Sequence, residues 1–145
     1  MNFNVVIPAR YESTRLPGKP LIEIAGIPMV IRTAIQASKS GANHVIIATD
    51  DIRIKNIAEK HNFKALMTDK SHTSGTDRVL DAANQESWLS DEIIINVQGD
   101  EPLINPELIK LLAKVLEKNN INYVSACSNF ANFDEYLNPN NVKVV

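Results

Sequence analysis

The chain has 145 residues, of which 44% are hydrophobic and 22% are charged, and its net charge is −2. This length fits one domain that buries roughly two thirds of its unfolded surface, and the composition excludes a disordered or fibrous protein. Because there is no overall positive charge and no apolar run of about eighteen residues, we expect neither a nucleic-acid partner nor a membrane partner. The opening residues do not resemble a secretion signal, and the single Cys127 fits a reducing compartment, so a cytoplasmic location is expected.

Strand-like apolar runs alternate with helix-like segments from one end of the chain to the other. Strands are expected at residues 5–7, 45–49, 65–67, 93–97, 123–127 and 142–145. Helices are expected at residues 28–40, 52–61, 76–86, 106–118 and around 133–137. Continuous apolar strands joined by helices are typical of a parallel sheet with both faces covered. The sequence therefore predicts an α/β fold, a Rossmann-like three-layer sandwich with a mostly parallel sheet, as one domain over residues 1–145.

The helix predicted at 106–118 has clear boundary and packing signals. Asn105 is a good cap and Pro106 suits the first helical turn. Apolar residues recur at steps of three and four, which predicts a single stripe facing the core. The stripe consists of Leu108, Leu111, Leu112, Val115 and Leu116.

The last two predicted strands carry two further expectations. Cys127 lies inside an apolar run and is expected to be a small buried hydrophobic residue. The final run ends at Val145 with no covering helix after it, which suggests that a longer protein continues or that a partner covers this edge.

The loop after the first strand, within the stretch PARYESTRLPGKPL at 8–21, is the strongest signal for function. It places Arg10, Arg15 and Lys19 beside Gly and Pro residues at a strand end. Ligands of open α/β sheets bind at the carboxyl ends of the strands, so these cations are well placed for a polyphosphate. The loop is not a Walker A sequence, and a merely solvated loop remains the alternative.

The next two loops are more ambiguous. Asp51 is better explained as a helix cap than as a metal ligand, and Ser74 or Thr76 would cap the following helix. Arg78 lies in the first turn of that helix, where a cation opposes the helix dipole, so a negatively charged or hydrogen-bonding ligand is expected there. His72 alone is weak support for a function.

The loop after the fourth strand, NVQGDEP at 96–102, places a carboxylate at the same edge of the sheet. Gly99 permits a tight turn that directs Asp100 out of the strand end. Mg²⁺ is usually held by one or two carboxylates with phosphate oxygens and water, and Asp100 opposite Lys19 and Arg15 offers that set. An ordinary acidic turn is the alternative for this loop taken alone.

Three motifs in this order, PARYESTRLPGKPL, HTSGTDR and NVQGDEP, resemble the 3-deoxy-manno-octulosonate cytidylyltransferases, also called CMP-Kdo synthetases. The resemblance extends over the whole chain to the NPNNVKVV ending. It implies a fold of the nucleotide-diphospho-sugar transferase type and transfer of CMP from CTP to the anomeric hydroxyl of Kdo. Pyrophosphate would be released, Mg²⁺ would be the cofactor, and the product would serve lipopolysaccharide biosynthesis.

The resemblance also implies roles for individual residues. Arg15, Lys19 and Asp100 would carry catalysis, with Asp100 as the metal ligand. Nucleotide contacts would come from Pro8, Ala9, Arg10, Arg15, Lys19, Ser74 and Gly75. Arg78 and Gln98 would help to hold the sugar acid. No nucleophilic side chain is required, because the sugar hydroxyl is the nucleophile and needs positioning and charge neutralisation at the α-phosphate.

This chain departs from the family in its length, because family members are longer. Their additional part supplies a second metal-binding carboxylate, most of the sugar-acid pocket and the elements of a homodimer. The chain is therefore expected to be an incomplete cytidylyltransferase domain. A truncated, non-catalytic CTP-binding module and a cytidylyltransferase for a related sugar acid are the alternatives.

Overall fold

The computed structural model describes residues 1–12, 16–139 and 141–143. The chain begins with strand β1 (Phe3–Ala9), a short 3-10 helix η1 (Lys19–Leu21) and a hairpin of β2 (Glu23–Ile24) and β3 (Ile27–Pro28). The elements that follow are α1 (Met29–Ser38), β4 (His44–Thr49), α2 (Ile52–Lys60), β5 (Lys64–Met67), α3 (Gly75–Gln85), β6 (Ile93–Asn96), α4 (Pro106–Asn119) and α5 (Phe133–Leu137).

The central sheet has the strand order β5-β4-β1-β6, and its neighbouring strands are parallel. In the centre, Val5 of β1 is in register with Val45 of β4 and Ile95 of β6. All seven residues of β1 are buried. A strand buried on both faces reads as a continuous apolar run, which explains why its centre, Val5 to Ile7, was recognisable in the sequence.

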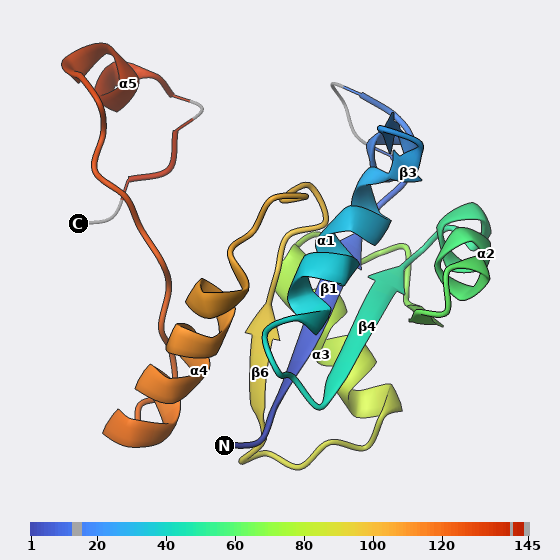
Figure 1. Cartoon of the computed structure of the whole chain (residues 1–145), viewed down its shortest axis with the longest axis horizontal. Helices are drawn as coiled ribbons and strands as arrows, with labels where there is room; N and C mark the ends of the chain where they lie inside the picture. Colours follow the sequence, from blue (N-terminus) through green and yellow to red (C-terminus); the bar gives the residue numbers. More distant parts are fainter. Residues whose placement is uncertain (13–15, 140, 144–145) are drawn as a thin grey trace.

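Helices cover both faces of the sheet (Figure 1). On one face, α1, α2 and α4 contribute Ile31, Ile54 and Ile109 to a core that also contains Val5 and Ile7 of β1. On the other face, α3 packs on Val6 and Ala48 through Val79 and Ala82. The alternation of Val5, Val6 and Ile7 between the two cores follows from the two-residue period of a strand. The predicted three-layer α/β sandwich is confirmed.

The helix caps confirm several boundaries. Asp51, Ser74 and Asn105 each accept a backbone hydrogen bond at the N-terminus of a helix. The predicted apolar stripe of α4 is partly wrong: the buried residues are Ile109 and Ala113, while the side chain of Leu111 is 54% exposed. The side of α4 that meets the core is centred on Ile109 and Ala113, and Leu112 and Leu116 of the predicted stripe pack beside them. None of the helices in the described parts of the chain is long and apolar enough to cross a membrane.

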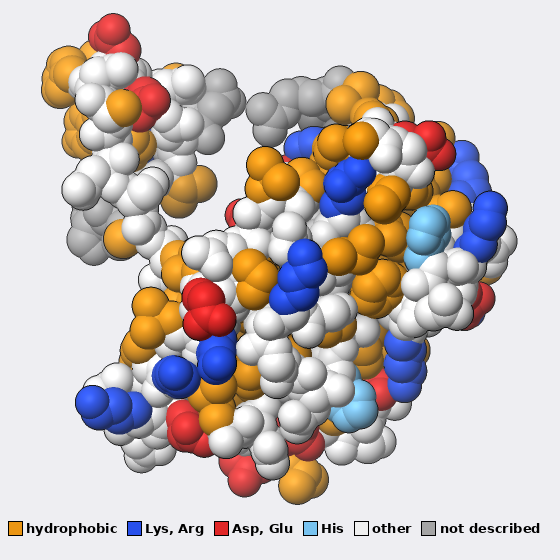
Figure 2. Space-filling view, viewed as in Figure 1, with side chains coloured by type: hydrophobic (Ala, Val, Ile, Leu, Met, Phe, Trp, Pro, Cys, Tyr) orange, Lys and Arg blue, Asp and Glu red, His pale blue; other side chains and the backbone are white. Residues whose placement is uncertain are grey.

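The prediction of strands near the C-terminus is wrong where it can be checked. Residues 123–127 form no strand, and Cys127 is exposed rather than buried. Residues 142–143 are not a strand either, and 144–145 lie outside the described residues. A strand needs a partner for its backbone, and this segment has left the sheet beyond α4 (Figure 1). Figure 2 shows hydrophobic side chains on the surface of the part that carries α5.

Candidate functional site

A cleft of about 690 Å³ lies at the carboxyl ends of β1 and β6. The chain runs outward from β1 to β4 and β5 and then returns to β6 on the other side of β1. Ligands of open parallel sheets bind where the strand order reverses in this way. Eight residues singled out in the sequence line the cleft: Pro8, Ala9, Arg10, Lys19, Gly75, Gln98, Gly99 and Asp100.

Lys19 and Asp100 meet in this cleft as an ion pair. The Lys19 Nζ lies 2.6 Å from the Asp100 Oδ2, and the two side chains are 38% and 49% exposed. The predicted approach of these two groups is therefore confirmed. Since both side chains reach solvent, an anion can approach the ammonium and a cation can approach the carboxylate.

Contacts with Tyr11 hold together the two ends of the loop that leads to Lys19. The Gly18 amide donates to the Tyr11 carbonyl over 2.8 Å, and a Cβ on Gly18 would lie 3.1 Å from the Tyr11 ring. The Arg53 guanidinium of α2 stacks on this ring, 3.4 Å from its centroid. Hydrogen bonds from Arg53 lower the pKa of the Asp51 carboxyl below its ordinary value. The stacking of Arg53 on Tyr11 thus holds this loop against α2.

Two glycines allow backbone segments to meet in the floor of the cleft. A Cβ on Gly99 would lie 3.0 Å from the Pro8 carbonyl oxygen, and one on Gly75 would lie 3.3 Å from Pro8 Cγ. The Gly99 carbonyl accepts a buried hydrogen bond of 3.1 Å from Thr33 of α1. Larger residues at 75 or 99 would push the loops apart, so glycine sets how closely the cleft walls approach.

The start of α3 contributes Gly75 to the cleft, and the loop before α3 lies beside Arg10. Arg10 Nη1 lies 3.5 Å from the His72 carbonyl oxygen and 3.4 Å from that of Thr73. The Ser74 hydroxyl accepts from the Asp77 amide and donates to the Asp77 carboxylate. Ser74 therefore acts as the cap of α3 in this structure, and its predicted nucleotide contact remains a prediction.

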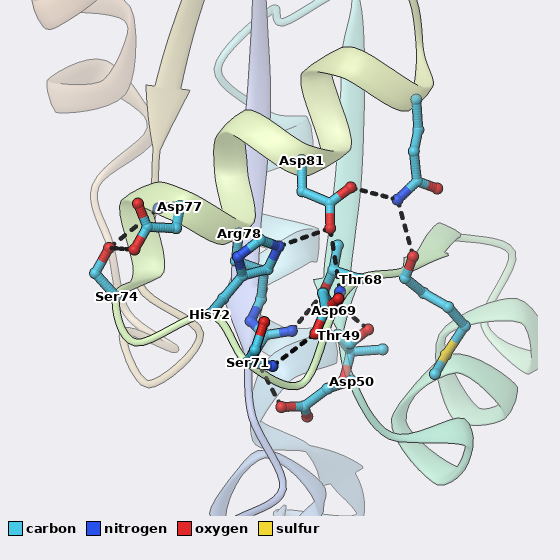
Figure 3. A network of polar contacts seen from close by, with 12 residues as sticks. Thr49, Asp50, Thr68, Asp69, Ser71, His72, Ser74, Asp77, Arg78 and Asp81 are labelled. Carbon is cyan, nitrogen blue, oxygen red and sulfur yellow. Dashed lines mark hydrogen bonds and ion pairs between the residues drawn. The ribbon is translucent and has the colours of Figure 1, made fainter.

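The placement of Arg78 argues against its predicted ligand role. Its side chain is 0% exposed, and its guanidinium donates to Asp50 Oδ2 over 2.9 Å and to the Thr68 hydroxyl (Figure 3). The cation in the first turn of α3 is therefore compensated by a protein carboxylate. Sequence reasoning missed this partner, because only the fold brings the loop after β4 under the start of α3.

Gln98 lines the cleft, whereas Arg15 lies outside the described residues. Within those residues, no three His, Cys, Asp or Glu side chains gather in a way that could hold a metal ion. Glu12, Pro17 and Pro20 also line the cleft. They lie in the motif recognised in the sequence, but nothing in their type marked them as cleft residues.

A parallel sheet with a cleft of opposed charges at its switch point places this chain among the α/β domains that bind ligands at the carboxyl ends of their strands. The chain belongs to the cytidylyltransferase family, whose profile matches residues 4–145. The fold and family predicted from the sequence are thereby confirmed.

Individual members of the family show which of its proteins this chain is similar to. The chain is 49% identical over 146 aligned positions to a 3-deoxy-manno-octulosonate cytidylyltransferase from Coxiella burnetii, covering 100% of this chain and 59% of that protein. It is also 49% identical over 143 positions to the protein of that name from Neisseria meningitidis, covering 99% of this chain and 56% of that one. The chain thus spans little more than half the length of these relatives.

A solved structure is similar to this chain in both fold and sequence. It is described as CMP:2-keto-3-deoxy-manno-octonic acid synthetase complexed with CTP, and it superposes with a TM-score of 0.76 at 39% identity. The superposition covers 83% of this chain and 49% of that one. The match in fold and sequence thus reaches a protein whose structure contains CTP.

Proposed function

We propose that this chain binds CTP in the cleft and forms the nucleotide-binding part of an enzyme that transfers CMP to the anomeric hydroxyl of Kdo. The observation that carries the proposal is the pairing of Lys19 with Asp100 at the switch point of the sheet. A cation and a carboxylate there suit a metal-bound triphosphate. The names of the relatives and the CTP in the similar solved structure support this choice of nucleotide and sugar.

The nucleotide would lie against the end of β1. The Lys19 ammonium would bind phosphate oxygens, with Arg15 as a second phosphate-binding group by the motif resemblance. Pro8, Ala9 and Arg10 would contact the nucleotide from the loop after β1, and Gly75 from the start of α3. Gln98 would contact the sugar acid from the loop after β6. The cleft position of the residues that the structure describes supports these roles.

Asp100 would hold Mg²⁺ together with the phosphates. Its carboxylate is about half exposed in the cleft, and one carboxylate with phosphate oxygens and water is a common Mg²⁺ ligand set. The residues present therefore fit this ion. When bound, Mg²⁺ would neutralise negative charge on the phosphates.

The proposed reaction needs no protein nucleophile. The anomeric oxygen of Kdo forms a bond to the α-phosphorus, the α–β phosphoanhydride bond breaks, and pyrophosphate leaves while the hydroxyl proton is released. The protein contributes by holding the reactants in line and by placing positive charge beside the phosphates. Lipopolysaccharide biosynthesis, a cytoplasmic location and a homodimer are parts of the same proposal, supported by the motif resemblance.

Calorimetry with Mg²⁺ and each of the four common ribonucleoside triphosphates tests the nucleotide assignment. CTP is expected to bind more tightly than ATP, GTP or UTP, and equal affinities would contradict it. Pyrophosphate release after Kdo is added tests the transfer. CTP binding without pyrophosphate would assign this chain alone a binding role, and turnover with a different sugar acid would replace Kdo in the proposal.

Substitution of Asp100 tests the metal assignment. Asp100→Asn keeps the size of the side chain but removes its charge, so we expect the enhancement of CTP binding by Mg²⁺ to be lost. The measurement is CTP affinity with Mg²⁺ and with EDTA. Glu107→Gln, at the start of α4, is the matched control. An unchanged Mg²⁺ effect in Asp100→Asn would remove the metal role.

A further inference from the structure

A buried ion pair lies directly beneath the start of α3. The guanidinium of Arg78 has no exposed surface, and its partner Asp50 is 14% exposed. Arg78 also donates to Thr68, whose hydroxyl donates to the Thr49 carbonyl over 3.1 Å. These contacts tie the first turn of α3 to the ends of β4 and β5 (Figure 3).

Stability alone does not account for this pair. Burying two charges costs desolvation energy that their attraction only partly repays, and apolar residues of similar size are often at least as stable. The first turn of a helix is also electrostatically unfavourable for a cation. In addition, the Arg78 Nε is buried and has no hydrogen-bond partner among the described residues. An arrangement with these costs is better explained by the geometry that it fixes.

The geometry in question is how closely the start of α3, which carries the cleft residue Gly75, approaches β1. Gly75, at the start of α3, lies against Pro8 and near Gln98. The carbonyls of His72 and Thr73, in the loop that leads into α3, face Arg10. Because Arg78 lies one helical turn after Ser74, a shift of its guanidinium would move the cap of α3 and the backbone of Gly75.

We propose that the Arg78–Asp50 pair is a positioning device that holds the start of α3 at the distance from β1 that the nucleotide requires. Arg78 acts through Gly75 and the loop before α3, without touching the ligand itself. The proposal rests on the proposed function for its ligand, CTP. It replaces the role in sugar-acid binding that the motif alone implied for Arg78.

Paired apolar substitutions separate positioning from stability. Arg78→Met and Asp50→Leu each leave one buried charge without its partner, so both single variants should unfold at lower temperature. The double variant removes both charges and should regain the unfolding temperature of the original chain. We expect its CTP affinity, measured by calorimetry with Mg²⁺, to remain about ten- to hundredfold weaker, because the cleft wall is no longer fixed.

Hydrogen exchange provides a readout that does not depend on CTP. The amides of Asp77 and Arg78 donate to Ser74 in the cap of α3. In the double variant, peptides spanning residues 69–78 should exchange faster, while peptides of β1 and β4 should be unchanged. Lys64→Met with Glu86→Gln removes the ion pair at the other end of α3 and is the matched control. This control should alter neither CTP affinity nor exchange in residues 69–78.

The outcomes separate the two proposals. A double variant that regains both stability and full CTP affinity would overturn the positioning role, as would unchanged exchange in residues 69–78. Loss of CTP affinity in Arg78→Met but not in Asp50→Leu would instead indicate a direct contact with the ligand. If the original chain does not bind CTP, the proposed function fails, and the exchange measurement still decides whether the pair fixes the start of α3.

Discussion

Lys19 is the residue whose replacement should affect ligand binding most directly. In the described part of the chain, the partner of its ammonium in the cleft is Asp100. Loss of one charged hydrogen bond to a phosphate should weaken CTP binding by about ten- to hundredfold in Lys19→Ala. The measurement is calorimetry in the presence of Mg²⁺. Lys39→Ala, at the far end of α1, should bind CTP as the original chain does, and equal affinity in Lys19→Ala would contradict the assignment.

Asp81 should make part of the stability of the protein depend on acid pH. Hydrogen bonds from Gln85, His72 and the Asp69 amide lower the pKa of Asp81 to about 2 from an ordinary value of 3.8. Because the folded state favours the charged form, this contribution is fully present above the ordinary pKa and is lost as the pH falls towards the folded one. The free energy of unfolding should therefore fall less between about pH 5 and about pH 2 in Asp81→Asn than in the original chain.

Urea denaturation at the two pH values measures this difference. Asp134→Asn, on the exposed helix α5, serves as the control and should retain the original pH dependence. An equal fall in Asp81→Asn and the original chain would show that the hydrogen bonds to Asp81 do not favour its charged form.

The sequence predicted which residues lie near the site better than it predicted what each side chain contacts. Lys19 and Asp100 were expected to meet because both follow strands of one parallel sheet, and strand ends of that kind share an edge. The protein partner of Arg78 was not predicted, because a cation at a helix start signals a nearby anion without saying whether that anion is a ligand or a side chain. Only the three-dimensional path of the loop after β4 identifies Asp50 as its partner.

At the scale of elements, α1 supports the loop that follows β6. The Thr33 hydroxyl is fully buried and lies within hydrogen-bond distance of the carbonyls of Gly99 and Met29. In Thr33→Val, the Gly99 carbonyl would remain buried without this donor, which should lower the free energy of unfolding by about 1–3 kcal/mol. Because Gly99 precedes Asp100, Mg²⁺-dependent CTP binding should weaken as well.

Urea denaturation and calorimetry measure the two effects. Thr33→Ser keeps the hydroxyl at the same position and should retain most of the stability and the CTP affinity. A Thr33→Val protein as stable as Thr33→Ser would show that the bond to Gly99 contributes nothing.

The elements that were predicted correctly are those that bury an apolar face. Strands β1, β4, β5 and β6 and helices α1 to α4 are visible as apolar periodicity because the sheet and its two cores impose that periodicity. The hairpin of β2 and β3 was missed, since each strand has only two residues and Pro28 is typical of a helix start. The segment 123–127 has strand-like residues, but strand propensity requires a neighbouring strand, which sequence periodicity does not reveal.

At the scale of the whole molecule, the last part of the chain contributes little to the core. Phe133, Tyr136 and Leu137 of α5 are 68%, 48% and 59% exposed, and the described core clusters contain no residue after Leu116. A chain that ends at Asn120, the C-cap of α4, should therefore unfold within a few degrees of the full chain.

Thermal unfolding followed by circular dichroism checks this expectation. A chain that ends before α4 loses Ile109 and Ala113 from the core and should be unfolded or strongly destabilised. A large fall in unfolding temperature for the chain ending at Asn120 would mean that residues 121–145 stabilise the sheet.

The central place of β1 has a consequence for biosynthesis. β1 leaves the ribosome before both of its neighbours, and the neighbour on one side is completed only at Asn96, since Phe3 pairs with Ile93. At a translation speed of roughly 5–20 residues per second, one edge of this mostly apolar strand stays open for several seconds in every nascent chain. During that interval, chaperones or other nascent chains can bind the open edge of β1. The rate of elongation between β4 and β6 should therefore influence how much newly made protein reaches the native state.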